Sequence, residues 1–235
     1  MVGWLSGCAM AAAVESSCAA CHRAIQGVPY VQHDFSDWKA SPHARARVSC
    51  EACHGGDPAQ KDKAQAHRAM LSSRDAKSPV YYTRVPATCG ACHQAEFAAF
   101  RKSAHYQELR RSGRGPNCVT CHGSMANSVL GPRGLETTCA LCHRKPTQAY
   151  EARIALDRCQ AELARLEAQL KAARGSGADL ARQKQELEAA QGLYRQAAQG
   201  WHAFKIPKVL QAAADISRRV KAAAAEVRLK AGPRP

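Results

Sequence analysis

The chain has 235 residues and a mass of 25.3 kDa, which allows one or two domains. Its formal net charge is +15 and only 6% of its residues are aromatic, so the surface is basic and large core side chains are few. No stretch approaches the ~18 consecutive apolar residues of a membrane span, so the sequence predicts no transmembrane helix. We expect something other than side chains to fill much of the core, and the twelve cysteines indicate what it is.

Residues 1–15 are Ala-rich and are interpreted as a leader or truncated signal region. The stretch Leu5-Ser6-Gly7-Cys8 resembles a bacterial lipobox, which makes Cys8 a candidate lipid anchor. The seven residues before it contain no basic region and too short an apolar stretch for a secretion signal. Two alternatives therefore stay open: the true start lies upstream, or the match is due to chance.

One pentapeptide, Cys-x-x-Cys-His, occurs five times within residues 16–145. Its cysteines are Cys18, Cys21, Cys50, Cys53, Cys89, Cys92, Cys118, Cys121, Cys139 and Cys142, and the histidines that follow them are His22, His54, His93, His122 and His143. This pentapeptide is the attachment signature of c-type haem. One helical turn places both thiols on the same face as the imidazole, so the thiols reach the two haem vinyl groups and the imidazole reaches the iron. Zinc knuckles and disulfide frameworks do not require a histidine after every second cysteine. We therefore expect five covalently bound c-type haems, each containing iron.

Each haem iron has a second axial position, and the histidines outside the motifs are also five in number. They are His33, His43, His67, His105 and His202. His43 and His105 each end an aromatic-x-x-Ser-x-His element that precedes a Cys-x-x-Cys-His-Gly motif, which is an internal repeat. Met10, Met70 and Met125 are competing ligands, and a Met ligand raises the reduction potential relative to a second His. We expect bis-His, low-potential haems, and the sequence leaves open which distal histidine serves which iron.

Short helices that carry the motifs should alternate with irregular loops through residues 16–145. Helical pieces are expected at 64–71 and 96–109, with little or no sheet. Gly55 and Gly123, which directly follow two of the motifs, indicate tight backbone turns.

The composition changes after Pro146, where Ala, Leu, Glu, Gln, Lys and Arg dominate. A coiled-coil seam with alternating spacings of three and four residues is formed by Leu156, Cys159, Leu163, Leu166 and Leu170. After a break at 174–177, a second helix would place Leu180, Leu187, Leu193 and Tyr194 on one side, so we expect an antiparallel hairpin. Pro207 fits the first turn of a final helix at about 208–229. Cys159 is interpreted as a small buried hydrophobic residue.

The predicted fold is mainly α with much irregular loop. A haem-packed multihaem cytochrome c domain is expected at 16–145, and a C-terminal antiparallel helical hairpin plus final helix, a coiled-coil-like arm, at 146–235. The arm would return to the haem domain if His202 is a ligand; otherwise it would serve dimerisation or docking.

These motifs resemble the multihaem cytochrome c superfamily, within the lineage of the tetrahaem cytochromes of ammonia oxidisers, pentahaem nitrite reductases and hydroxylamine-oxidoreductase-like proteins. The likeness rests on the Ser-x-His and Cys-x-x-Cys-His-Gly units, on residues 78–89 before the third motif, and on Trp201-His202-Ala-Phe204 before the final helix. It implies close-packed haems that relay electrons rapidly. Nitrite reductases of this kind use a Lys at one motif, whereas all five motifs here end in His, so that activity is not carried over.

The sequence thus predicts an electron-transfer protein outside the cytoplasm, in the periplasm or at the cell surface. Its redox partners would be proteins such as a membrane-bound quinol oxidase or a terminal reductase, and the helical arm is also a candidate for forming an oligomer. A basic chain also suggests nucleic acid, but we expect none, because the cationic residues lie among haem motifs and would neutralise propionates or dock an acidic partner.

An enzyme is the rival interpretation. One five-coordinate haem, with His202 as the histidine that misses its iron, would reduce a small nitrogen or sulfur oxyanion attracted by Arg110, Arg111 and Arg114. A subunit that uses its arm to assemble a larger complex is a third interpretation, and it is compatible with electron transfer.

Overall fold

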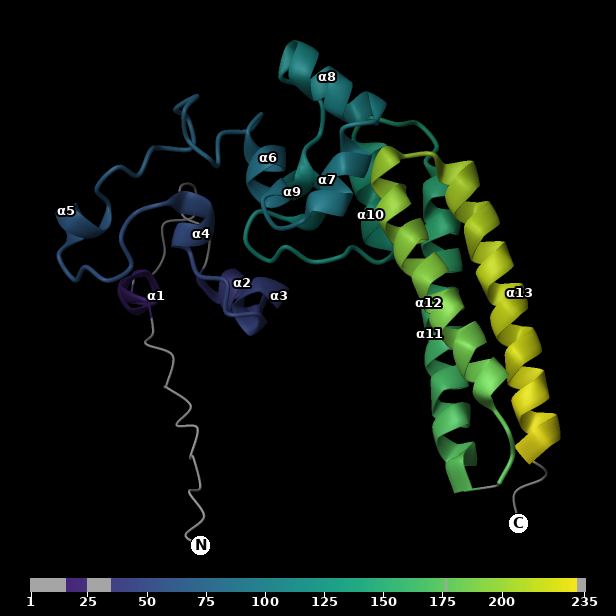
Figure 1. Ribbon diagram of the computed structural model, residues 1–235. Coiled ribbons are helices and arrows are strands. Elements are labelled where there is room, and N and C mark those ends of the chain that lie inside the picture. Colours follow the sequence, from purple (N-terminus) through teal and green to yellow (C-terminus); the bar gives the residue numbers. More distant parts are fainter. Residues whose placement is uncertain (1–15, 25–34, 176, 232–235) are drawn as a thin grey trace, which may run out of the picture. The chain divides into compact units, whose positions relative to one another are not determined.

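A computed structural model describes residues 16–24, 35–175 and 177–231 (Figure 1). The described residues form helices and loops and no strand, which confirms the prediction of a mainly α fold with much irregular loop. The short helices are α1 (Ser17–His22), α2 (Phe35–Ala40), α3 (Pro42–Arg45), α4 (Glu51–His54), α5 (Lys63–Ala66), α6 (Val85–Gly90), α7 (Gln94–Phe100), α8 (Ala104–Ser112), α9 (Cys118–His122) and α10 (Pro132–Ala140). The C-terminal elements are α11 (Thr147–Ala172), η1 (Ala173–Gly175), α12 (Ala181–Gly200), η2 (Trp201–Ala203) and α13 (Ile206–Ala231).

None of the helices in the described ranges combines the length and the apolar character needed to cross a membrane.

The chain divides into two compact units, and the first comprises residues 1–81 and 125–127. It contains α1 to α5, which are joined by loop hydrogen bonds: the Ser17 N–H donates to the Pro58 carbonyl at 3.1 Å, and the Asp57 N–H donates to the Ala66 carbonyl at 2.9 Å. Ala19 is the one buried apolar residue among those the structure describes in this unit. Side chains therefore supply almost no core to this unit.

The second unit comprises residues 82–124 and 128–235, and its largest part is a bundle of α11, α12 and α13 (Figure 1). All five residues of the predicted seam on α11 are buried, and so are Leu180 and Leu187 at the start of the second helical stretch. Leu193 and Tyr194 are partly buried against the same core. The buried positions of α13 repeat at spacings of three and four residues and are Val209, Ala213, Ile216, Val220, Ala223 and Val227. These alternating spacings place one apolar stripe of each helix toward the other two.

Cys159 lies in this bundle core, where its Sγ donates a hydrogen bond to the Ala213 carbonyl at 3.2 Å. It is 1% exposed, which agrees with its interpretation as a small buried residue.

Two helices differ from their predicted bounds, and in each place the local backbone structure explains why. The predicted helix at 96–109 is split into α7 and α8 because the Ser103 side chain accepts from the Tyr106 N–H and begins a new helix. The predicted helix at 64–71 ends at Ala66, and Ala69 has a positive φ of 64°, a conformation that a helix cannot contain.

The predicted leader (1–15) lies outside the described residues, and so do Cys8, Met10 and His33. The division at 145/146 is a compositional one and stays a prediction. Along the chain, the first compact unit ends at Tyr81 and the second begins at Tyr82, with residues 125–127 belonging to the first.

Candidate functional site

Each Cys-x-x-Cys-His motif forms one turn of helix. In three of them the histidine N–H donates to the carbonyl of the first cysteine: His54 to Cys50 at 3.0 Å, and His93 and His143 to Cys89 and Cys139, both at 2.9 Å. The other two motifs lie inside α1 and α9. Because residues i, i+3 and i+4 of a helical turn share one face, each motif presents two thiols and one imidazole together.

Glycines and a cap fix how these turns end and begin. Gly55 (φ 74°, ψ −159°) and Gly123 (φ 78°, ψ 154°) directly follow motif histidines and adopt a conformation that is essentially restricted to glycine. Before α9, the Asn117 side chain accepts from the Val119 and Thr120 N–H groups, and the Thr120 hydroxyl accepts from the Asn117 N–H. This capping box sets where the Cys118–His122 turn starts.

The aromatic-x-x-Ser-x-His repeat is a helix-starting device. Ser41 accepts from the Ala44 N–H and Ser103 from the Tyr106 N–H, each at 3.1 Å, and both serines are 1% exposed. His43 and His105 therefore both occupy the second position of a helix, α3 and α8 respectively. Because the N-cap is the same, both side chains leave the backbone at the same position in the first turn of their helix.

The structure brings histidines together in pairs, each pair joining one motif histidine and one histidine from outside the motifs. The ring centroids of His22 and His67 are 6.1 Å apart, with 36° between the ring planes. The corresponding values are 5.9 Å and 58° for His105 and His143, and 6.1 Å and 20° for His122 and His202. Each pair lies within a single compact unit.

These separations fit two imidazoles on opposite sides of one metal ion. A metal–imidazole bond is about 2 Å long, and the ring centroid lies about 1 Å beyond the nitrogen, so opposed ligands have centroids about 6 Å apart. Two imidazoles alone do not complete a transition-metal site, whereas a porphyrin would supply the remaining nitrogens. In the described part of the chain, no group of three or more His, Cys, Asp or Glu is arranged to hold a metal ion.

Hydrogen bonds at Nδ1 leave Nε2 free on several of these rings. The Nδ1 of His67 lies 2.7 Å from the Lys63 carbonyl, that of His122 lies 3.0 Å from the Ser128 carbonyl, and that of His202 lies 3.2 Å from the Gln199 carbonyl. Since a carbonyl only accepts, Nδ1 carries the proton and Nε2 carries the lone pair. Metal-binding histidines usually donate their other N–H in this way.

Burial favours the neutral form of two of the paired rings. It lowers the pKa of His105, with the nearby His143 adding to the effect. It also lowers the pKa of His202, against a smaller opposing contribution from the Gln199 carbonyl. A neutral imidazole retains the lone pair that a metal ligand needs.

The other predicted ligands lie outside these pairs. His43 begins α3, and its Nδ1 lies 3.2 Å from the Oδ1 of Asn127, a residue that no sequence pattern had indicated. His54 ends α4, and His93 directly precedes α7. His33 lies outside the described residues.

The described cysteines are all free thiols, so the structure contains no disulfide framework among them. Neighbouring motifs approach one another through their thiols. A hydrogen bond between Cys89 and Cys118 raises the pKa of Cys118, and burial raises the pKa of Cys121 to about 11, with Cys139 adding to it. Burial likewise raises the pKa of Cys50, with Cys18 as the second cause. The third, fourth and fifth motifs are thus neighbours in series, and the first and second form another neighbouring set.

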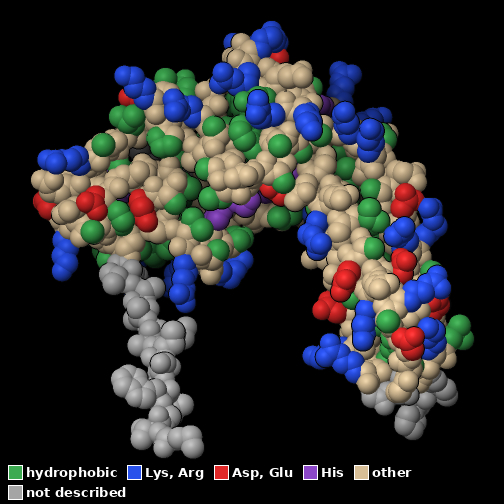
Figure 2. Space-filling model, viewed as in Figure 1, with side chains coloured by type: hydrophobic (Ala, Val, Ile, Leu, Met, Phe, Trp, Pro, Cys, Tyr) green, Lys and Arg blue, Asp and Glu red, His purple; other side chains and the backbone are tan. Residues whose placement is uncertain are grey.

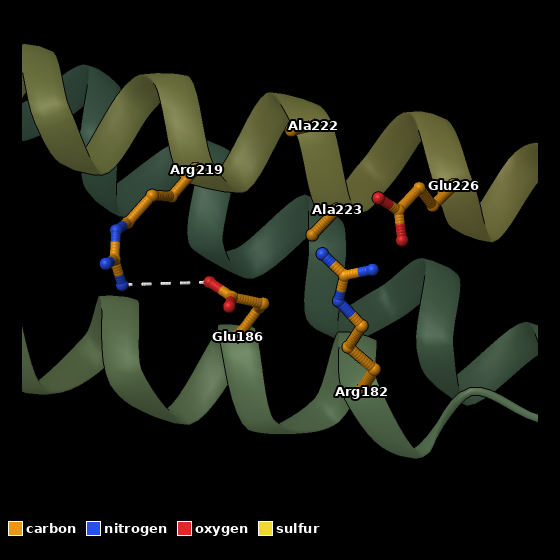
Figure 3. Close-up of a pocket in the computed structure, with 6 residues that line it drawn as sticks. All are labelled: Arg182, Glu186, Arg219, Ala222, Ala223 and Glu226. Carbon is orange, nitrogen blue, oxygen red and sulfur yellow. Dashed lines mark ion pairs between the residues drawn. The ribbon is translucent and has the colours of Figure 1, made fainter.

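A surface pocket between α12 and α13 has a different character (Figure 3). Glu186 and Arg219 form an ion pair of 3.7 Å across it, and Arg182, Ala222, Ala223 and Glu226 complete the lining. None of these residues is a cysteine or histidine, so the pocket is separate from the candidate site.

Comparisons with known proteins bear on the same residues. The family model for cytochrome c554 and c-prime matches residues 6–55, which include the first two motifs. The C-type polyheme cytochrome OmcB of Geobacter sulfurreducens is 26% identical over 132 residues, which cover 51% of this chain and 16% of OmcB. The multiheme cytochrome MtrA of Shewanella baltica is 27% identical over 130 residues, covering 55% of this chain and 32% of MtrA.

The chain thus spans about a sixth of OmcB and about a third of MtrA. No solved structure matches it. The matches are thus to multihaem c-type cytochromes, and they support covalently bound c-type haem at the Cys-x-x-Cys-His motifs. They do not single out the lineage of ammonia oxidisers and nitrite reductases.

Proposed function

We propose that this chain binds five c-type haems, each ligated by two histidines, and relays electrons between redox partners outside the cytoplasm. The observation that carries the proposal is the set of three histidine pairs at 5.9–6.1 Å. In each pair, one ring belongs to a Cys-x-x-Cys-His turn, and the other comes from a segment at least 38 residues away in the sequence. Chance packing of surface histidines would not match every described pair to a motif.

The pairs assign three distal ligands. His67 would serve the haem on Cys18 and Cys21, His202 the haem on Cys118 and Cys121, and His105 the haem on Cys139 and Cys142. His43 and His33 remain the candidate ligands for the other irons, without an assignment to particular motifs. The Asn127 contact supports His43, because metal-binding histidines usually have an oxygen acceptor at their second ring nitrogen.

Bound haem supplies a one-electron couple at its iron. This chain determines the reduction potential of that couple and the position of the haem relative to electron donors and acceptors. The motif turns hold the attachment thiols, and the Nδ1 contacts fix the ring tautomers. The hydrogen bond between Cys89 and Cys118 and the electrostatic influence of Cys139 on Cys121 place successive motifs near one another, which favours transfer along the series formed by the third, fourth and fifth motifs.

A basic surface formed by α8 and the residues that flank it is the proposed docking face for an acidic redox partner. The α8 basic surface is defined by Arg101, Lys102, Arg110, Arg111 and Arg114, all of them exposed. Figure 2 shows Lys and Arg side chains gathered over the part of the molecule that carries α8 in Figure 1. Because α8 also carries His105, a partner held there by opposite charge would lie near one of the proposed haem sites.

His202 also distinguishes the relay from an enzyme. A catalytic haem needs an open axial position, and His202 was the histidine expected to leave one. Its ring instead faces His122, at 20° between planes, with Nδ1 held by the Gln199 carbonyl. This arrangement favours two ligands at that haem.

The test uses the full chain produced in a host that attaches c-type haem. We expect a mass increase equal to five haems and an electron paramagnetic resonance (EPR) spectrum that contains only low-spin iron. His202→Ala should convert one haem to a high-spin form that binds carbon monoxide, while the haem count stays at five. Lys208→Ala, an exposed change in the adjoining helix, should leave the spectrum unaltered. A wild-type protein with fewer haems, or with a high-spin haem that binds nitrite, would overturn the proposal.

A further inference from the structure

Phe204 lies against His105 in an unusual backbone conformation. It follows η2 with φ 56° and ψ 28°, a left-handed geometry that is uncommon for aromatic residues, and its N–H donates to the Trp201 carbonyl at 2.7 Å. The edge-to-face contact with the His105 ring has a centroid distance of 4.2 Å and an angle of 80°. Strain of this kind persists where the surrounding structure demands a particular side-chain position.

His105 differs from the other distal histidines at its Nδ1. This atom is buried and has no hydrogen-bond partner among the described residues. By contrast, the distal His67 and His202 have Nδ1 within 3.2 Å of a backbone carbonyl, as does the motif residue His122, and His43 has an amide oxygen there. Apolar packing against Phe204, and not a hydrogen bond, therefore holds the His105 ring.

An unbonded Nδ1–H makes an imidazole a weaker electron donor. When Nδ1–H donates to an oxygen, the ring becomes more basic and stabilises the oxidised, more positive iron. Without that bond, the oxidised form is less stabilised and the reduction potential rises. Burial of the ring acts in the same direction, because low polarity disfavours the more highly charged state.

The η2 turn, which Phe204 directly follows, also contains His202. The His105–His143 and His122–His202 pairs can therefore be compared directly. The His122–His202 pair has an Nδ1 acceptor on both rings and an angle of 20° between planes. The His105–His143 pair lacks the acceptor on His105, and its rings are inclined by 58°. Ring inclination changes how the imidazole π orbitals overlap with the iron, and EPR detects that change.

We propose that Phe204 is a positioning residue that holds His105 inclined and free of a hydrogen bond, giving the haem on Cys139 and Cys142 a higher reduction potential than the haem on Cys118 and Cys121. This inference rests on the proposed bis-His ligation. At equilibrium, electrons would therefore favour the haem held by His105 and His143 over the haem held by His122 and His202. His105 lies on α8, the helix at the α8 basic surface.

The test is a redox titration of the five-haem protein with Phe204→Asn and Phe204→Leu. Asn accepts a left-handed backbone and places an amide oxygen beside His105, so one of the five midpoint potentials should shift downward. Leu keeps an apolar contact without the aromatic edge, so the potentials should change less, while the EPR signal of the inclined pair moves toward that of a parallel pair.

A double variant shows whether Phe204 acts through His105. In a His105→Met background, Phe204→Asn should cause no further shift in any potential. Unchanged potentials in Phe204→Asn with five haems retained would overturn the inference, and so would an equal downward shift in the His105→Met background. A wild-type protein without five low-spin haems would instead contradict the proposed function, so the two failures are distinguishable.

Discussion

The motif region (residues 16–145) and the three-helix bundle (α11 to α13) differ in how many apolar side chains they bury. The bundle buries seventeen apolar residues in one core cluster, with Leu166 and Ile216 fully inaccessible. The described residues of the motif region bury six, namely Ala19, Val85, Pro86, Phe100, Leu109 and Leu135. Leu141, between Cys139 and Cys142 of the fifth motif, is 77% exposed. A helix bundle is thus held together by side chains, whereas the motif region needs apolar surface that its own side chains do not provide.

The motif region relies instead on caps, turns and the proposed haems. Its helices have four to nine residues, too short to be stable alone. Buried Ser41, Ser78, Ser103 and Asn117 each bond to backbone groups and order these short pieces. The comparison therefore predicts that changes in the two regions will have separable effects.

The largest expected effect comes from withholding haem. In the full chain produced without haem attachment, residues 16–145 should exchange their amide hydrogens almost freely, because the apolar surface that completes this region is missing. Amides of α11 to α13 should stay protected by the bundle core. Hydrogen exchange with mass spectrometry measures both regions in one sample. Equal protection in the two regions would contradict the contrast drawn between them.

Ile216→Ala tests the bundle alone. Ile216 is 0% exposed in the core, so the truncation should cost about 2–5 kcal/mol of unfolding free energy, from lost burial and the cavity left behind. Denaturant unfolding followed by circular dichroism measures the change. Leu229→Ala, at a residue 83% exposed, is the matched control and should change the free energy by less than about 0.5 kcal/mol. The haem spectrum should stay the same in both variants.

His43→Met and His105→Met test the repeated ligand element. A thioether ligand raises the potential relative to imidazole, so each variant should shift one midpoint potential upward without loss of haem. The shift at His105 should be the smaller one, because that ring already lacks an Nδ1 acceptor. Spectrally resolved redox titration provides the comparison. An unaltered titration curve in either variant would remove that histidine from the ligand set.

Ser103→Ala should have the smallest effect. Loss of an N-cap costs about 1 kcal/mol, and here the Tyr106 N–H would lose its acceptor at the start of α8. The EPR signal of the His105–His143 pair should broaden, because the backbone that carries His105 is less well held. Ser112→Ala, near the exposed C-terminal end of the same helix, is the control. If both variants give the same spectrum as the wild type, the cap does not orient His105.

Local chemistry in the sequence determined much of this protein. The five one-turn motifs depend on spacings of three and four residues, and Gly55 and Gly123 provide the turns that were expected of them. The bundle seam from Leu156 to Leu170 was likewise predictable, because helical periodicity alone identifies a buried stripe. The sequence also contained a signal for the split between α7 and α8, because serine strongly favours the N-cap of a helix and Ser103 lies at that point. The continuous helical pattern expected over 96–109 obscured this signal.

Only the tertiary structure decided which histidines meet. His122 and His202 are 80 residues apart, and no spacing rule connects them. Their pairing depends on how α12 and η2 pack against α7, and the Phe204 contact with His105 depends on the same packing. Caps, turns and periodic stripes follow from neighbours along the chain, so the sequence reveals them. Ligand pairs and ring inclinations depend on contacts between distant segments, because their energies are set by packing that no local pattern encodes.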